Sequence, residues 1–232
     1  MKLAVFDVGT RNFAMIIEHT PGEAIKKLQH GYKHLPAKDK IKEGRPHASA
    51  LQKILEEYYT KCRTVKLELY DPNQGSKEGL TIQTRKNLFE FLESHKKDLI
   101  GCGFIAIEEQ YYNPRMGVIN KPALLLAESC YTWLLLNVPN VPVEYTPSRY
   151  KTALLACPKE SLKVDKETGL RILTKWEKSD RKKWSIAKAK EIYKLRDDAV
   201  MIDYIDGRKG DDVSDCLLMS IAFVLKTWVM DQ

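Results

Sequence analysis

The sequence predicts an α/β fold in which a mixed five-stranded sheet is flanked by helices. Two apolar runs that each carry an acid, residues 3–8 and 103–110, have the pattern of strands buried on both faces. Segments with helical spacing separate the later strands, which indicates helices packed on a sheet. The predicted order is strand, strand, strand, helix, strand, helix, strand, helix, in a single domain that spans residues 1–232.

The N-terminal elements are predicted from apolar runs and turn residues. Residues 3–8 form the first strand and residues 12–19 the second, and the three-residue connection between them makes a hairpin. A third strand is expected around residues 25–35. Helices are expected at residues 48–61 and 81–99. Residues 37–80 are interpreted as an insertion, with a loop at residues 71–79.

The C-terminal elements are predicted in the same way. Residues 103–110 and 141–145 are the fourth and fifth strands, with helices at residues 122–136, from residue 146, and from residue 180. Residues 157–170 and 199–209 are expected to be connections. A closing helix follows Gly210, because apolar residues recur at helical spacing and form one stripe: Val213, Leu217, Ile221, Val224 and Trp228.

The net charge and the cysteine content indicate which kinds of partner and which cellular environment the protein has. The chain has 232 residues, a net charge of +7 and a sequence pI near 9.0. These values favour an anionic partner, nucleic acid first and an acidic membrane surface second. The five cysteines are scattered without metal-site spacing, which indicates reduced thiols. We expect a soluble, intracellular protein in which no segment reaches a membrane-spanning length.

Four acids stand at positions where chemistry is expected. Asp7 lies inside an apolar run, where a carboxylate is costly without a partner or a metal. Glu108 ends a second such run. Asp212 and Asp215 are three residues apart and share one face of the closing helix. If the first and fourth strands are adjacent, all four carboxylates meet near the start of that helix.

Carboxylate oxygens select hard divalent cations such as Mg²⁺ and Mn²⁺. Two such ions about 4 Å apart can activate a water and stabilise the leaving oxygen in phosphodiester hydrolysis. Lys151 and Lys183 are candidates to stabilise charge on the phosphate or to help activate the water. The plainer alternative is a solvated, acidic first turn with two surface lysines.

Four short stretches, in this order, resemble one known family. They are residues 6–12 (FDVGTRN), 107–110 (IEEQ), 180–185 (DRKKWS) and 210–215 (GDDVSD). The chain resembles the RuvC-type Holliday junction resolvases of the ribonuclease H-like superfamily, and most of all their poxvirus-type branch. The resemblance covers most of the chain and is weakest over residues 22–99.

The resemblance implies a metal-dependent endonuclease with a ribonuclease H-like fold. It implies a homodimer that resolves four-way (Holliday) DNA junctions by paired symmetric nicks, in recombination or in the processing of replication intermediates and concatemers. It implies Mg²⁺ as cofactor, replaceable by Mn²⁺, with two ions per site. A viral origin would place the protein in the cytoplasm of a host cell.

The resemblance also assigns roles to residues. The implied metal ligands are Asp7, Glu108, Asp212 and Asp215, with Asp211 as an alternative to Asp212. Lys151 and Lys183 are implied as catalytic, with Lys182 as a near substitute for the second. Basic residues around the proposed site would neutralise DNA phosphates: Arg11, Arg115, Arg149, Arg181, Lys182, Arg208 and Lys209.

Other functions fit parts of the pattern. A related nuclease of the same fold, acting on RNA–DNA hybrids, flaps or other branched DNA, is the main alternative, since a fold does not fix a substrate. An actin-like or sugar-kinase ATPase shares the Asp-Val-Gly-Thr stretch but needs a second glycine-rich phosphate loop, which the sequence lacks. A catalytically inactive junction-binding module would not need four acids.

Overall fold

The computed structural model describes residues 1–110, 112–113, 118–164, 171–207 and 210–231. The elements of the first half are β1 (Lys2–Asp7), β2 (Phe13–His19), α1 (Gly22–His34), a 3₁₀ turn (Ala37–Asp39), α2 (Ser49–Tyr59), β3 (Arg63–Tyr70), α3 (Ile82–Ser94), α4 (Lys96–Ile100), β4 (Phe104–Glu109), β5 (Tyr112–Asn113) and β6 (Val118–Ile119). Those of the second half are α5 (Lys121–Asn137), β7 (Val143–Pro147), α6 (Arg149–Leu154), β8 (Glu160–Val164), β9 (Arg171–Lys175), α7 (Lys178–Leu195), α8 (Ala199–Asp206), α9 (Gly210–Val224) and its π-helical continuation η3 (Leu225–Met230).

The predicted five-stranded mixed sheet is confirmed. Its strand order is β3-β2-β1-β4-β7. Strands β1 and β2 form the predicted antiparallel hairpin, and β3 continues that half of the sheet antiparallel to β2. Strand β4 runs parallel to β1, and β7 parallel to β4. The first and fourth strands are therefore neighbours, which is the condition for the carboxylates to meet, and their carboxyl ends lie at one edge of the sheet.

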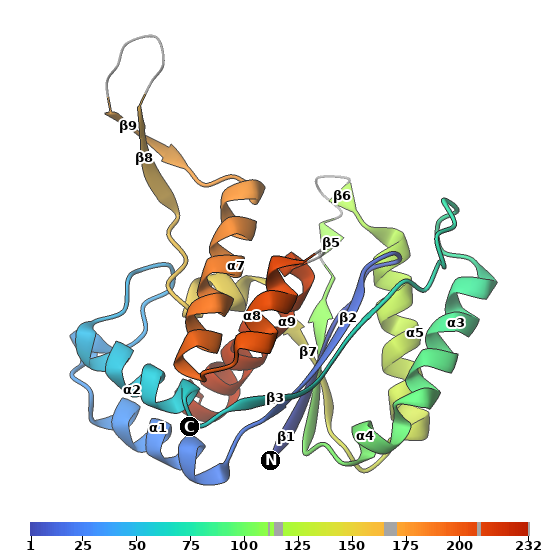
Figure 1. Ribbon diagram of the computed structural model, residues 1–232, viewed down its shortest axis with the longest axis horizontal. Helices are drawn as coiled ribbons and strands as arrows, with labels where there is room; N and C mark the ends of the chain where they lie inside the picture. The colour runs from blue at the N-terminus through green and yellow to red at the C-terminus, as the bar shows by residue number, and fades with distance from the viewer. Residues whose placement is uncertain (111, 114–117, 165–170, 208–209, 232) are drawn as a thin grey trace.

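Helices cover both faces of this sheet (Figure 1). On one face, α9 packs across β1 and β2, and α6, α7 and α8 pack on α9. On the other face, α5 packs on β4 and β7, with α3 beside it. Each face has its own hydrophobic core, as expected for a sheet whose central strands are buried on both sides.

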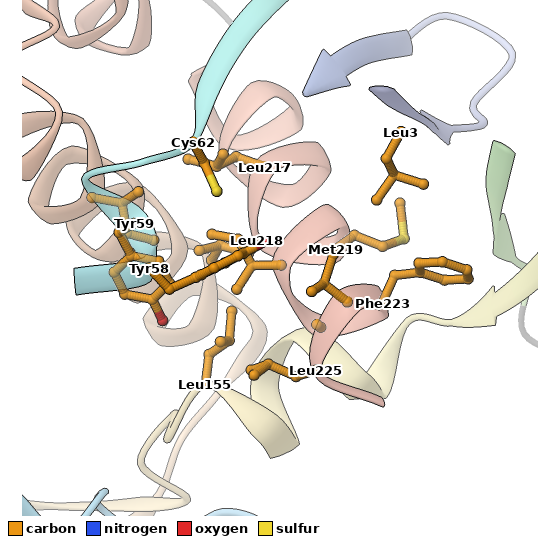
Figure 2. Packing of buried hydrophobic residues seen from close by; sticks show 14 of the residues in the cluster. Leu3, Tyr58, Tyr59, Cys62, Leu155, Leu217, Leu218, Met219, Phe223 and Leu225 are labelled. Carbon is orange, nitrogen blue, oxygen red and sulfur yellow. The ribbon is translucent and has the colours of Figure 1, made fainter. Parts of the chain in front are cut away.

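Helix α9 is the centre of the larger core. Figure 2 shows Leu217, Leu218, Met219 and Phe223 pointing in different directions from this helix into the surrounding side chains. All four are at most 3% exposed. The predicted single stripe is therefore too narrow, because α9 is enclosed on all sides from Cys216 onward, and a helix that is apolar all round is a buried helix.

This enclosure bears on the membrane prediction. Within the described residues, one helix, Gly210–Met230, is long and apolar enough to cross a membrane by length and composition. The expectation that no segment reaches such a length is therefore wrong. However, 72% of its most apolar window is buried inside the molecule, as in the core helix of a folded domain.

The third strand of the sheet lies at a different place in the sequence from the one predicted. Residues 25–34 of this range belong to helix α1, not to a strand, and the buried residues Ala24, Ile25, Leu28 and Tyr32 follow helical spacing. The third strand is β3, which pairs with β2 along the edge of the sheet. Residues 37–80, expected to be an insertion, thus supply both helix α2 and one strand of the central sheet.

Two expected connections contain secondary structure. Residues 157–170 include β8, which pairs with β9 as an antiparallel hairpin, and residues 199–209 include helix α8. In Figure 1 the β8–β9 hairpin stands away from the body of the protein, above the start of α7. The expected helix over residues 81–99 is divided into α3 and α4 at His95.

A buried ion pair joins the sheet to α7 at the end opposite β1's carboxyl terminus. The guanidinium of Arg196, at the end of α7, lies 2.7 Å from Glu18 Oε2 on β2, and both side chains are 3% exposed. The Thr64 hydroxyl on β3 donates a second hydrogen bond to Glu18. The charges are thus compensated, as buried charges must be.

Candidate active site

Two carboxylates meet at the edge of the sheet. Asp7 is the last residue of β1, and Glu108 lies one residue beyond Ile107, which pairs with Phe6 across the two parallel strands. The two carboxyl groups share a hydrogen bond. Burial, followed by the charge of Glu108 and this hydrogen bond, raises the pKa of Asp7 well above its ordinary value. The fold thus favours the protonated form of Asp7.

Lys151 joins this pair to the closing helix. Its Nζ atom lies 3.3 Å from Glu108 Oε1 and 2.7 Å from Asp215 Oδ2. The Lys151 side chain is only 12% exposed. Burial alone would lower the pKa of Lys151, but the charges of Glu108, Asp215 and Asp7 outweigh it and raise that pKa. The lysine is therefore a permanent cation among three acids from three different elements.

Gly210 determines how closely α9 begins beside α8. A Cβ atom on Gly210 would lie 1.9 Å from the carbonyl oxygen of Ile205, so only glycine permits this approach. The first turn of α9 then presents Asp211 and Asp212, where the helix dipole stabilises negative charge. Lys182 on α7 forms an ion pair with Asp211, and that hydrogen bond raises the pKa of Lys182.

These groups line one open cleft with a volume of about 580 Å³. Two acidic elements, the end of β4 and the start of α9, contribute to its walls together with α6 and the first turns of α7. The described lining residues are Glu108, Ser148, Arg149, Lys151, Thr152, Lys178, Arg181, Lys182, Ser185, Asp211, Asp212 and Asp215. A cleft with acids on one wall and cations on the other can hold a phosphodiester between bound cations and basic side chains.

The chain was compared with known proteins. No protein-family model matches it, and no curated protein matches it in sequence. The crystal structure of the Fowlpox virus resolvase with its substrate Holliday junction DNA aligns with a TM-score of 0.48 and 10% identity over 97% of each chain. Thermus thermophilus RuvC aligns with a TM-score of 0.52 and 12% identity over 98% of each chain. The chain has the fold of RuvC.

The RuvC-type fold brings most of the predicted site residues together. Asp7, Glu108, Asp215 and Lys151 are in mutual electrostatic contact, while Asp212 lines the cleft with Arg149, Arg181 and Lys182. Asp211, the alternative to Asp212, also lines it, in its ion pair with Lys182.

Other predicted residues lie elsewhere. Lys183 is exposed and is not among the described lining residues, so Lys182 takes the position that was assigned to Lys183. Arg11 is exposed in the turn between β1 and β2, at the same edge of the sheet but outside the cleft lining. Arg115, Arg208 and Lys209 lie outside the described residues.

Four lining residues were missed by the sequence reasoning: Ser148, Thr152, Lys178 and Ser185. A signal for two of them was present. Lys178 and Ser185 lie at helical spacing from Arg181 and Lys182, so all four project from one face of α7. Lys183 points from a different face, because each residue turns the helix by about 100°.

The acids fit a divalent cation by their chemistry. All are oxygen donors, and Asp215 Oδ1 is buried without a hydrogen-bond partner among the described residues, as expected of an atom that coordinates an ion. Within those residues, no three His, Cys, Asp or Glu side chains are grouped closely enough to hold a metal as they stand. Lys151 lies between two of the acids, so a cation would take over contacts that its ammonium now makes.

Proposed function

We propose that this protein is a metal-dependent, structure-specific endonuclease that resolves four-way DNA junctions by paired symmetric nicks. The observation that carries the proposal is the convergence of Asp7, Glu108 and Asp215 around Lys151 at the carboxyl edge of the sheet. A partly buried cluster of three acids and one lysine costs stability, so its presence beside a cleft points to chemistry. The RuvC-type fold places that cluster in an architecture known to support a nuclease site.

The acids would hold the cofactor. Asp7, Glu108, Asp212 and Asp215 are the proposed ligands for Mg²⁺, with Mn²⁺ as a substitute and two ions per site. When bound, such ions supply Lewis-acid activation of a water and stabilisation of the leaving oxygen. Only the ionised form of Asp7 coordinates a cation, so the binding of a cation and the binding of a proton would compete at Asp7.

Lys151 and the cations of α6 and α7 act on the substrate. Lys151 neutralises the acids before a cation binds, which keeps Glu108 and Asp215 close despite their repulsion. Once bound cations neutralise Glu108 and Asp215 instead, the positive charge of Lys151 can stabilise the scissile phosphate. Arg149, Arg181 and Lys182 line the same cleft and would bind the phosphates on either side of the cut.

Paired nicks require two active sites on one junction. We therefore propose a homodimer, with one cleft for each of two continuous strands. Sedimentation of the free protein tests this, since a dimer would have twice the chain mass of 26.7 kDa. A monomer both free and bound to a junction would contradict it.

The substrate preference is tested by measuring the cleavage rates of three synthetic nucleic acids in Mg²⁺: a four-way DNA junction, a linear DNA duplex and an RNA–DNA hybrid. We expect a four-way junction to be cut faster than linear duplex or an RNA–DNA hybrid, with nicks at symmetric positions on opposing strands. Equal rates on the junction and the hybrid would instead support the related nuclease of the same fold.

A further inference from the structure

A second cavity continues from the catalytic cleft to the base of the β8–β9 hairpin. Its volume is about 450 Å³. Arg149, Thr152 and Arg181 line both spaces, so the two are contiguous. We call this space the hairpin-base cavity. Its other described lining residues are Glu43, Gly44, Ala153, Cys157, Pro158, Lys159, Glu160, Lys175 and Trp176.

Trp176 does not pack in either of the two hydrophobic cores that flank the sheet. It is partly buried, yet it does not belong to the side chains packed on either hydrophobic cluster. Its indole Nε1 is buried and has no hydrogen-bond partner among the described residues. An indole N–H is a donor only, and a buried donor without an acceptor is costly. Trp176 is therefore placed to donate to an acceptor that binds in the cavity.

The backbone around Trp176 is fixed. Its amide donates to the carbonyl of Lys159 at 2.9 Å, which closes the base of the hairpin. Its carbonyl accepts from Arg181 Nη1 at 3.4 Å, which ties it to the first turns of α7. The indole is thus positioned by two elements that also carry cations into the cavity.

Charge indicates the chemistry of the occupant. The described lining of the hairpin-base cavity has four cations, Arg149, Lys159, Lys175 and Arg181, against the two acids Glu43 and Glu160. In sequence, residues 159–183 contain nine Lys and Arg against five Asp and Glu, so their net charge of +4 is more than half of the chain's +7. Such a lining complements a polyanion with strong acceptor oxygens.

We propose that the hairpin-base cavity binds the phosphodiester backbone of the duplex DNA arm that leaves the cleavage site. In this arrangement Arg149 and Arg181 bridge from the scissile region, Lys159 and Lys175 contact phosphates farther along the arm, and Trp176 donates its indole N–H to a phosphate oxygen. The proposal rests on the proposed function, since that function identifies the arm as DNA.

The test measures binding in chelator, so that nothing is cut, to labelled four-way junctions with either long arms or arms trimmed close to the crossover. The Lys159→Gln/Lys175→Gln double variant should bind the long-armed junction about tenfold more weakly. The slope of log affinity against log salt should fall by about 2, as expected for two lost phosphate contacts. Binding to the trimmed junction should not change.

Two further variants make the result specific. Trp176→Phe keeps an aromatic ring but removes the donor, and should also weaken long-arm binding by about tenfold at an unchanged melting temperature. The double variant Lys26→Gln/Lys53→Gln removes the same charge from exposed positions on α1 and α2, and should leave both affinities as in the wild type. Unchanged long-arm affinity in the hairpin-base variants, or an equal loss in the control, overturns the proposal.

Cleavage of the trimmed junction separates this proposal from the proposed function. The hairpin-base variants should cut the trimmed junction at the wild-type rate. If the wild type cuts no junction, the proposed function fails, while the arm-dependent binding can still be observed. If the wild type cuts and the variants bind long arms normally, only the hairpin-base proposal fails.

Discussion

At the scale of single residues, Asp7 is held where its negative charge costs stability. Asp7 is held beside Glu108 in a partly buried position, with its pKa raised by burial first and by Glu108 second. A group whose pKa is raised by folding contributes stability below its ordinary pKa and loses it as pH rises through the raised value. The contribution of Asp7 to the free energy of unfolding should therefore fall as pH rises above about 4, where an unfolded aspartate ionises.

Asp7→Asn tests this cost. In chelator at pH 7 the variant should be more stable than the wild type by about 1 kcal/mol, or about 2–4 °C in melting temperature, because it is neutral at every pH. It should also lose cleavage. The measurement is thermal unfolding from pH 4 to 8, with exposed Asp203→Asn as the control. A variant that is less stable at pH 7, and that follows the wild-type pH profile, would contradict the role given to Asp7.

The acids could be predicted at this scale, but some of their partners could not. An acid inside an apolar run is visible in sequence because its burial is costly, and this identified Asp7 and Glu108. Lys182 and Lys183 are adjacent in sequence and alike in chemistry. Which of them faces the cleft is decided by the rotation of α7 about its axis, and that rotation is set by how α7 packs on α9 and α8.

At the scale of elements, the start of α9 is fixed by close backbone contact. Gly210→Ala would place a methyl group against the Ile205 carbonyl and push the first turn of α9, with its two acids, away from Lys182. We expect a loss of about 1–3 kcal/mol in stability and at least about tenfold in cleavage. Gly22→Ala is the matched control, since a Cβ there meets nothing within 4 Å. Equal behaviour of the two variants would contradict the account of α9.

The other end of the sheet is fixed by the Glu18–Arg196 pair. Arg196→Met leaves a buried carboxylate without its cation and should cost about 3–5 kcal/mol. Lys27→Met, which breaks an exposed pair with Glu57, should cost about 0–1 kcal/mol. The midpoint of urea unfolding measures both. A cost for Arg196→Met as small as that of the control would show that the pair does not hold α7 to the sheet.

Some elements carried signals that the sequence reasoning did not use. The buried residues of α1 follow helical spacing, and Val65, Leu67 and Leu69 alternate in β3 as a strand requires. By contrast, β8 and β9 form a separate two-stranded sheet, and Lys and Glu are frequent in their sequence, as they are in a loop. No local pattern distinguishes such a hairpin from a connection.

At the scale of the whole molecule, function depends on where distant segments meet. Strands β1 and β4, helix α6 and helix α9 each contribute one member of the Asp7, Glu108, Lys151 and Asp215 cluster. The common pattern of the first and fourth strands predicted that both are buried and carry an acid, but it left their adjacency open. The position of Lys151 between the acids was not, because it depends on how α6 packs on α9.

The central claim is that these acids hold divalent cations for cleavage, and one titration tests it most directly. The rate of nicking of a four-way junction is measured against Mg²⁺ concentration for the wild type and Asp215→Asn, with junction affinity measured in chelator. We predict that the wild type nicks only with the metal, and that Asp215→Asn loses about a thousandfold in rate while binding the junction normally. Full activity in chelator, or a loss of affinity equal to the loss of rate, would contradict the claim.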